Sequence, residues 1–315
     1  MPPAKDSVET TVHRPDMVFS KITGSQWDIK KGDIKLIKKI GEGATGVIYE
    51  AKFLGQSVAA KSLKTWGDGL IEQAYKDIVM ELDVLECVGK HPNLVGFFGV
   101  CMEDKRRPVV IEELVGGPCL EDYLQNGGCR GDLKRGTILA WSQDLFRALE
   151  FLHNRDPIIM HRDLKPGNLI LTGDRSTLKL ADFGMSKMVR KSEMAHVINT
   201  GYTGTVRYMA PEVLTQRKGH YTEKADIYSA GLIIWYIASG VRPLVLKTDT
   251  EEDLRVRPPL ESMRWPNLGA IADKCWAHDP AHRPSATAVL RDLAAMPDAP
   301  TLRVPAPPQC FCLIS

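Results

Sequence analysis

The sequence predicts an α+β protein in which a small β-rich part precedes a larger, mainly helical part. In the first third, apolar and polar residues alternate at the strand period, as from Ile34 to Ile40 and from Val47 to Phe53. Farther along, apolar residues recur at helical spacing, as from Ile138 to His153. With 315 residues, the chain is too long for one small core and suits one two-lobed unit or two domains.

Composition excludes several classes of function. The 41 basic and 39 acidic residues give a net charge of +2, so no broad basic surface for nucleic acid is expected. Seven cysteines, an odd number with no Cys-x-x-Cys pair, favour a reduced intracellular protein. The N-terminus lacks the apolar segment of a secretory signal. The longest apolar run, Ala230–Ala238, is about half of what a bilayer crossing needs, so it predicts a buried helix.

Residues 1–33 are expected to form a flexible N-terminal arm, because they are rich in Pro, Ser and Thr and show no lasting period. The strand from Ile34 then leads into a Gly-x-Gly-x-x-Gly motif made of Gly41, Glu42, Gly43, Ala44, Thr45 and Gly46. Such a motif also opens dinucleotide-binding folds, which need a helix at the last glycine. Here the β-branched, alternating run Val47–Phe53 follows, so a hairpin tip is predicted. The tip is either a phosphate cover or a plain turn.

A lysine and an acid are the next candidates. Lys61 ends the apolar strand that begins at Ser57, where it is either a solvated edge residue or an inward-pointing group that needs a partner. Apolar residues at helical spacing from about Glu72 to Val88 predict a helix that also carries Glu81. Its acids are either the wet face of that helix or a source of the partner.

The chain then changes character. Strands are predicted at about Leu94–Cys101 and Pro108–Leu114, followed by paired glycines at 116 and 117 that suit a hinge. Helices are predicted at Leu120–Leu124 and Ile138–His153. A ligand is expected in a cleft between the β-rich part and the helical part.

The stretch from His161 to Asn168 carries several polar side chains within a short segment. Asp163, Lys165 and Asn168 supply a carboxylate, an ammonium and a carboxamide within eight residues. Phosphoryl transfer needs a group that orients the acceptor hydroxyl, a positive charge for the moving phosphate and a metal ligand. A polar surface turn uses the same residue types, and the other motifs of the chain weigh against that interpretation.

Five motifs occur in a fixed order. They are Gly41–Gly46, Val58-Ala59-Ala60-Lys61, His161–Asn168, Asp182-Phe183-Gly184 and Ala210-Pro211-Glu212. On these residues the chain resembles eukaryotic protein kinases over about residues 34–294. The resemblance implies a two-lobed kinase fold: an antiparallel N-lobe with one helix at about 34–111, a hinge at 112–117 and a mainly helical C-lobe at 118–294. Ile48 and Ala60 depart slightly from the usual motifs and put no catalytic group in doubt.

The resemblance also implies roles for single residues. Lys61 would contact the α- and β-phosphates of ATP and pair with Glu81. Asp163 would be the catalytic base and Lys165 would stabilise the transferred phosphate. Asn168 and Asp182 would bind Mg²⁺, whose preference for few protein oxygens fits one carboxamide and one carboxylate.

The adenine site follows from the same resemblance. Adenine would lie between Ile48 and Ala59 on one side and Ile170 on the other, and would bond to the backbone from Glu112 to Leu114. Ile111 would be the gatekeeper. These apolar side chains also suit core packing, and the two roles are compatible. The resemblance further pairs Glu212 with Arg283 as a structural ion pair.

Lys165 and Thr205 resemble serine/threonine kinases, and the stretch up to Glu212 resembles the tyrosine-kinase-like group with its Raf-like and mixed-lineage members. The expected partners are protein substrates, other kinases among them. The rivals are a nucleotide-binding pseudokinase scaffold, whose usual losses are absent here, and a tyrosine or dual-specificity kinase. Arg162 beside Asp163 suits binding of a phosphate on the activation segment. The hydroxyls at 192, 200, 202, 203 and 205 are candidates; Thr200 and Thr203 are preferred, and Thr205 is expected to act structurally near Asp163.

Residues 295–315 form a proline-rich tail outside the resemblance. It is expected to be an extended stalk. Its last four residues, Cys312 to Ser315, match the prenylation pattern of cysteine, two aliphatic residues and a terminal serine. One lipid gives only marginal membrane binding, so palmitoylation of Cys310 is the expected second signal. The expected location is the cytoplasm, with peripheral attachment to a membrane.

Overall fold

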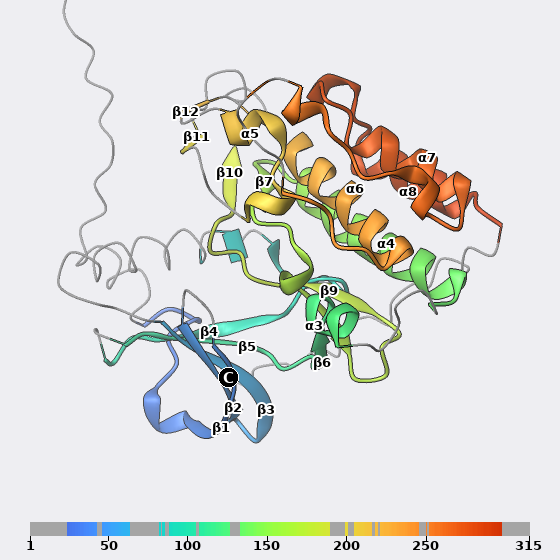
Figure 1. Cartoon of the computed structure of the whole chain (residues 1–315). Coiled ribbons are helices and arrows are strands. Elements are labelled where there is room, and N and C mark those ends of the chain that lie inside the picture. Colours follow the sequence, from blue (N-terminus) through green and yellow to red (C-terminus); the bar gives the residue numbers. More distant parts are fainter. Residues whose placement is uncertain are drawn as a thin grey trace, which may run out of the picture. The chain divides into compact units, whose positions relative to one another are not determined.

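The computed structural model describes residues 24–42, 46–63, 82, 84–85, 88–104, 107–126, 133–189, 199–200, 205–215, 218–219, 221–245, 250 and 252–297. The chain divides into two compact units. The first comprises residues 1–80 and 97–114, and the second comprises residues 81–96 and 115–315. Figure 1 shows that the first is built on a sheet and the second mainly on helices.

The first unit is a five-stranded antiparallel sheet. Its spatial order is β1-β2-β3-β5-β4, and its strands are β1 (Ile34–Glu42), β2 (Gly46–Phe53), β3 (Gln56–Leu63), β4 (Phe97–Cys101) and β5 (Val109–Glu113). Glu42 pairs with Val47, so β1 and β2 flank the glycine motif as a hairpin. The strand predicted after Gly46 is thereby confirmed, and the helix that a dinucleotide-binding motif requires is absent from Gly46–Phe53.

One face of this sheet carries the core of the unit. Ala51, Val58, Ala60, Cys101 and Ile111 are buried together. The register explains the grouping, because Ala51 lies opposite Val58 and Ala60 lies opposite Ile111. Residues directly opposite in an antiparallel pair share a face, so the small and branched side chains of four strands, β2 to β5, meet there.

Residues 24–33 are packed against the sheet, which corrects their assignment to a flexible arm. Ile29 is 5% exposed and its N–H donates to the carbonyl O of Val100 at 3.0 Å. The ring of Trp27 lies 5.2 Å from that of Phe97. Gly99, at φ 149°, makes this approach possible, because a Cβ there would lie 2.6 Å from the carbonyl O of Trp27. The sequence period did not reveal this segment, because the segment is short and is joined to β4 by backbone hydrogen bonds.

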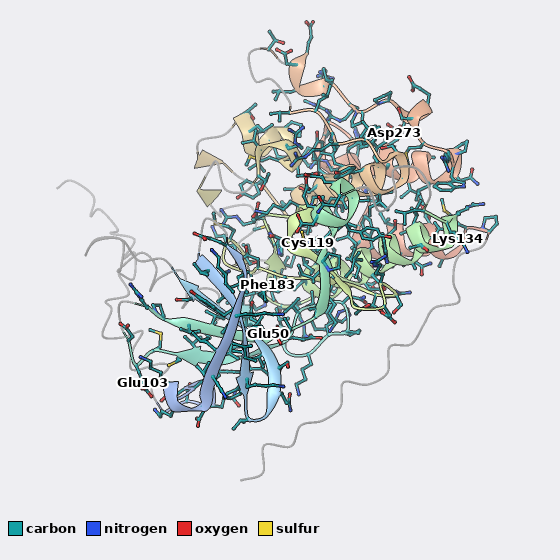
Figure 2. All side chains as sticks on the ribbon, turned by 60° about the horizontal axis from the view of Figure 1, so that its bottom comes forward. Glu50, Glu103, Cys119, Lys134, Phe183 and Asp273 are labelled. Carbon is teal, nitrogen blue, oxygen red and sulfur yellow. The ribbon has the colours of Figure 1, made fainter. Side chains whose placement is uncertain are left out.

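The second unit is mainly helical. Its helices are α3 (Leu120–Gln125), α4 (Arg135–His153), α5 (Pro211–Thr215), α6 (Lys224–Ser239), α7 (Pro266–Cys275) and α8 (Ala286–Ala294), with short 3-10 turns between them. Its short strands are β6 (Gly116–Cys119), β7 (Ile158–Met160), β8 (Leu169–Thr172), β9 (Leu178–Leu180), β10 (Lys187–Val189), β11 (Asn199–Thr200) and β12 (Lys218–Gly219). Figure 2 labels Cys119 and Lys134, the N-cap residues of α3 and α4.

Helix α6 lies at the centre of this unit, as its apolar run predicts. Residues Ala225 to Ala238 are all buried. The helix packs against α4 and α7 (Figure 1). Gly231 permits the contact with α7, since a Cβ there would meet the Cβ of Cys275 at 2.7 Å. Among the described helices, none combines the length and the apolar character that a membrane span requires.

The paired glycines after β5 lie in a strand. Gly116 and Gly117 belong to β6, which pairs with β8, and the boundary between the two units falls just before them, between Leu114 and Val115, so the hinge at 112–117 stays a prediction. A Cβ on Gly117 would overlap the carbonyl O of Leu171, so the strand approaches β8 more closely than a side chain allows. The predicted α+β kinase architecture, an antiparallel sheet unit and a helical unit, is confirmed.

Candidate active site

The loop that carries the predicted catalytic residues is held by hydrogen bonds to one buried carboxylate at the start of α6. Asp226, 2% exposed, accepts hydrogen bonds from the backbone N–H of His161 and of Arg162, both at 2.9 Å. His153, at the end of α4, places its Nε2 3.0 Å from the same carboxylate. Burial alone would raise the pKa of Asp226, but these hydrogen bonds and the charges of His153 and His161 bring it below the ordinary value.

His161 then ties this loop to the chain that follows β9. Its Nε2 donates to the carbonyl O of Ala181 at 3.0 Å, and its ring meets that of Phe183 edge to face at 5.4 Å. Both side chains are buried, with Phe183 2% exposed and labelled in Figure 2. The position of His161 therefore fixes Asp163 on one side and Asp182 on the other.

Asp163 lies at the centre of a set of donors. Its Oδ1 accepts from the hydroxyl of Thr205 at 3.0 Å. Its Oδ2 accepts from Nζ of Lys165 at 2.5 Å and from Nδ2 of Asn168 at 3.3 Å. Asp163 is 8% exposed. Its carboxylate is held in one orientation by these three hydrogen bonds. The structure brings together the base, the ammonium and the carboxamide that the sequence singled out, and it adds Thr205, in the structural position expected for it.

The residues predicted to bind Mg²⁺ fit that ion. Nδ2 of Asn168 donates to the carbonyl O of Asp163 at 2.9 Å, so its Oδ1 points the other way and accepts no hydrogen bond from a described residue. The backbone joins Asn168 to the second candidate, because the N–H of Ala181 donates to the carbonyl O of Asn168 at 2.8 Å. Asp182 follows at φ 65°, a conformation that is rare outside glycine. A carboxamide and a carboxylate oxygen are ligands that Mg²⁺ accepts alongside phosphate oxygens.

No group of three or more His, Cys, Asp or Glu residues suited to a metal occurs in the described parts of the chain. A closed protein cage for a metal is therefore not part of this site as described. The Asn168 and Asp182 pair would instead hold an ion that substrate phosphates also coordinate.

Lys61 belongs to the sheet of the first unit, on the face opposite the core cluster. It is 7% exposed and lies opposite Ile48 on β2 and Val110 on β5. Ala59, two residues earlier on β3, shares this face. The side chains that the resemblance assigns to the phosphates and to one side of adenine are therefore neighbours on one surface.

The register assigns Ile111, the predicted gatekeeper, to the core face of the sheet, and its role as gatekeeper stays a prediction. Ile111 lies opposite Ala60, is fully buried and belongs to the core cluster on the other face. Val110, opposite Lys61, and Glu112, opposite Ala59, are the residues of β5 that share the face of Lys61. Sequence order alone could not decide this, because a shift of one residue moves a strand side chain to the opposite face.

Several predicted site residues keep their status as predictions. Gly41 and Glu42 end β1 and Gly46 begins β2, Leu114 follows β5, and Ile170 lies in β8 opposite Cys119. Thr200 lies in β11, where its backbone pairs with Lys218. Outside the described residues lie Gly43, Ala44, Thr45, Glu81, Thr203, Cys310 and Cys312.

The expected pair between Glu212 and Arg283 is present. The guanidinium binds both carboxylate oxygens, at 2.7 and 2.8 Å. Its remaining donors reach the carbonyl O atoms of Ala277, Lys224 and His278. The side chain is fully buried, so this complete set of partners is what makes burying the charge tolerable. The pair fixes α5, which follows the Thr205 segment, to the loop before α8.

Asp226 and His153 are the functional residues that sequence reasoning did not assign. The signal was available in part: Asp226 is an acid in the first turn of an almost wholly apolar helix, and buried acids need partners. His153 ends α4 and carried no local signal. Their roles depend on two helices that meet only in the folded chain.

Comparison with known proteins agrees with this geometry. The model of the protein kinase domain matches residues 34–293. The chain belongs to this family, as its motifs predict.

Three similar proteins illustrate the relationship. The probable serine/threonine-protein kinase drkD of Dictyostelium discoideum is 32% identical over 275 residues, which cover 86% of this chain and 20% of that protein. The serine/threonine-protein kinase VIK of Arabidopsis thaliana is 34% identical over 278 residues, 85% of this chain and 61% of that protein. The serine/threonine/tyrosine-protein kinase HT1 of Arabidopsis thaliana is 31% identical, over 84% of this chain and 67% of that protein. The chain thus spans about a fifth of the first and three fifths of the second.

Replacing Asp226 by Asn should destabilise the second unit by about 3 kcal/mol, because an amide cannot accept from both backbone N–H groups and leaves one buried donor unpaired. The lowered pKa of Asp226 stabilises the folded state. This stabilisation is complete above the unfolded pKa of 3.8 and is lost as the pH falls through the folded pKa. Urea unfolding at pH 7, and at several values from pH 3.8 downwards, measures both effects. Glu261→Gln, on an exposed carboxylate, is the control. An Asp226→Asn protein as stable as Glu261→Gln would contradict the anchoring role.

Proposed function

We propose that the chain is a protein kinase that transfers the γ-phosphoryl group of ATP to serine and threonine hydroxyls of protein substrates, in a signalling cascade. The observation that carries the proposal is the arrangement around Asp163. A buried carboxylate is held by Thr205, Lys165 and Asn168, and the two predicted metal ligands lie on either side of one backbone hydrogen bond. A turn of ordinary polar residues would not need this convergence.

Each side chain has a task in this reaction. Asp163 orients the acceptor hydroxyl and takes its proton, while Lys165 lies near enough to balance negative charge as the phosphate moves. Thr205 holds one carboxylate oxygen of Asp163, which leaves the orientation of the carboxylate defined. Lys61, on the sheet face with Ile48 and Ala59, binds the α- and β-phosphates. Mg²⁺ bound by Asn168 and Asp182 would neutralise charge on the β- and γ-phosphates.

Serine/threonine specificity within the tyrosine-kinase-like group rests on Lys165 and Thr205, which the structure joins through Asp163. The names of VIK and drkD, both serine/threonine-protein kinases, agree with it. The name of HT1 includes tyrosine, so a dual specificity is the second candidate. Identification of the phosphoamino acids in a labelled substrate decides between the two. Other kinases are the protein substrates that this group suggests.

Asp163→Asn should reduce phosphoryl transfer at least about a hundredfold, because the acceptor proton loses its base. Lys61→Met should do the same by removing a phosphate contact, whereas Lys35→Met, on an exposed lysine of β1, should not. Transfer of labelled γ-phosphate to casein is measured, beside the thermal shift caused by ATP and Mg²⁺. Equal transfer by wild type and Asp163→Asn would refute the proposed kinase activity. A thermal shift without transfer in the wild type would favour a pseudokinase.

We also propose that phosphorylation between Asp182 and Glu212 activates the chain, with Thr200 and Thr203 as the sites. Arg162 donates from Nε to the hydroxyl of Tyr221 at 2.8 Å. Burial and the nearby charge of Arg162 lower the pKa of Lys187, so two cations lie near each other, as in a site that binds a phosphate.

Phosphatase treatment should therefore lower the activity at least about tenfold, since an ordered segment would be lost. The double variant Thr200→Ala, Thr203→Ala should match the treated protein, and Ser176→Ala, on a turn residue before β9, should not. Full activity after complete dephosphorylation, verified by intact mass, would contradict this switch.

The tail leads to a proposal on location: a cytoplasmic kinase attached peripherally to a membrane by a prenyl group on Cys312 and a palmitoyl group on Cys310. Its support is the sequence pattern alone. In cells with prenyltransferase activity, wild type should partition with membranes, Cys312→Ser should not, and Cys310→Ser should partition weakly. Cys275→Ser, which changes a buried cysteine, tests whether loss of membrane partition results from misfolding. Equal partition of wild type and Cys312→Ser, with no prenyl mass, would reject the anchor.

A further inference from the structure

Strand β1 lies at an edge of the sheet, and its apolar side chains remain uncovered. In the described sheet it pairs with β2 alone (Figure 1). All six residues from Lys35 to Ile40 are exposed, with Leu36 52% exposed, Ile37 49% and Ile40 44%. The alternation that predicts this strand would bury its apolar residues against the sheet, so their exposure indicates a surface that contacts something else. We call residues 35–40, together with Lys52 on β2, the β1 surface.

Ile37 and Ile40 lie at two irregularities of the strand. The register of β1 on β2 shifts at both positions, so neither isoleucine has a partner residue on β2. Bulges and lysines at a sheet edge hinder pairing with a further strand. The β1 surface is therefore poorly suited to adding a strand from another chain, and its side chains are what a partner would contact.

Two lysines of the β1 surface face each other without an acid between them. Lys35 lies directly opposite Lys52, and like charges in that position repel each other. Nζ of Lys52 donates to the hydroxyl of Ser57 at 3.0 Å, which is a neutral partner. Lys35 makes no hydrogen bond or ion pair with a described residue. This end of the hairpin is therefore positively charged.

Two further lysines have acidic partners. Lys38 pairs with Glu50, labelled in Figure 2, at 3.3 Å, and Lys39 pairs with Glu42. The lysine side chains are 67% and 53% exposed, so water and salt screen both pairs. Residues 30–57 hold six lysines and three acids, a net charge of +3, whereas the whole chain has +2. Positive charge is thus concentrated on this hairpin and on the segment that leads into it.

An anionic membrane is the partner that this chemistry fits. Apolar side chains next to lysines are typical of surfaces that lie in the interface of a bilayer, where lysines contact anionic headgroups and apolar groups reach the acyl boundary. The row from Leu36 to Ile40 is about 13 Å long and lies on an edge, which a flat surface can reach without a pocket. Lipid headgroups at Lys35 and Lys52 would supply the negative charge that the register of the strands does not.

We propose that the β1 surface binds membranes that contain anionic lipids, with Leu36, Ile37 and Ile40 at the level of the headgroups. The proposal goes beyond the proposed kinase reaction and does not require the lipid anchor proposed for the tail. Because one lipid chain binds a membrane only weakly, this surface would give a lipid-modified chain a further point of attachment.

The test uses the full chain with Cys310→Ser and Cys312→Ser, so that no lipid on the tail contributes. Flotation measures the partition of this parent chain onto vesicles of phosphatidylcholine alone and of equimolar phosphatidylcholine and phosphatidylserine. Each measurement is made at low and at high salt, because salt screens attraction between a basic surface and anionic headgroups.

Two kinds of variant separate charge from apolar contact. Lys35→Glu reverses one charge, and Arg264→Glu in the second unit is its control. The pair Ile37→Ser, Ile40→Ser removes two apolar side chains, and Leu244→Ser in the second unit is its control. All five residues are exposed, so each variant should fold as the parent does, which thermal unfolding verifies.

The parent should partition at least about tenfold more strongly onto the mixed vesicles than onto phosphatidylcholine alone, and high salt should reduce this difference. Lys35→Glu and the isoleucine pair should each lower partition onto the mixed vesicles at least about fivefold. The controls should equal the parent. Acetylation of lysines, followed by mass spectrometry, needs no variant: mixed vesicles should protect Lys35 and Lys52 and leave the exposed Lys274 unprotected.

Equal partition onto the two kinds of vesicle, or β1 variants that bind as the parent does, would overturn the proposal. So would vesicle binding that leaves acetylation of Lys35 and Lys52 unchanged. If the parent ignored vesicles but bound a peptide of alternating Glu and Leu, and Lys35→Glu did not, the surface would belong to an acidic protein segment instead. A dimer in sedimentation that the isoleucine pair dissociates would assign it to a second copy of the chain. These readouts need neither phosphoryl transfer nor lipidation, so their failure is distinct from failure of the kinase or anchor proposals.

Discussion

The carboxylate of Asp226 is the interaction on which the site in the second unit depends. It is buried at the start of a helix whose residues are almost all inaccessible, and it holds two consecutive backbone N–H groups of the catalytic loop. A buried charge is costly unless it is hydrogen-bonded, and here His153 and the loop provide the bonds. The same bonds that stabilise the carboxylate therefore position the residues next to Asp163.

From this anchor the order extends along the backbone. His161 bonds to the carbonyl O of Ala181 and contacts the ring of Phe183, and Asn168 is joined to Ala181 by a second hydrogen bond. The two predicted metal ligands are thus placed by one framework, although they belong to separate motifs. Arg162 and Asp182 adopt positive φ angles of 69° and 65°, a local strain of the kind that surrounding bonds must hold at functional sites.

A second buried charge supports the segment after Thr205. Arg283 uses its guanidinium on Glu212 and on three carbonyl groups, so α5 is attached to the loop before α8. The Thr205 segment is held from α6 as well, through Ser229. The chain around Thr205 is therefore attached at two points, through Glu212 of α5 and through Ser229 of α6.

The sequence by itself determined the family, the two kinds of unit and the chemistry of Asp163, Lys165 and Asn168, because these depend on residue type and spacing within short segments. Strand and helix periods also predicted β2, α4 and α6 well, since β2 alternates at the strand period and the two helices bury apolar residues at helical spacing. Only the tertiary structure decided that Ile111 faces the core and Glu112 the face of Lys61, because strand register assigns faces. It also decided that Gly99 admits Trp27 and Ile29, that Gly117 lies in β6, and that Asp226 and His153 meet. These contacts join residues distant in the chain, and no local pattern encodes which of them will be neighbours.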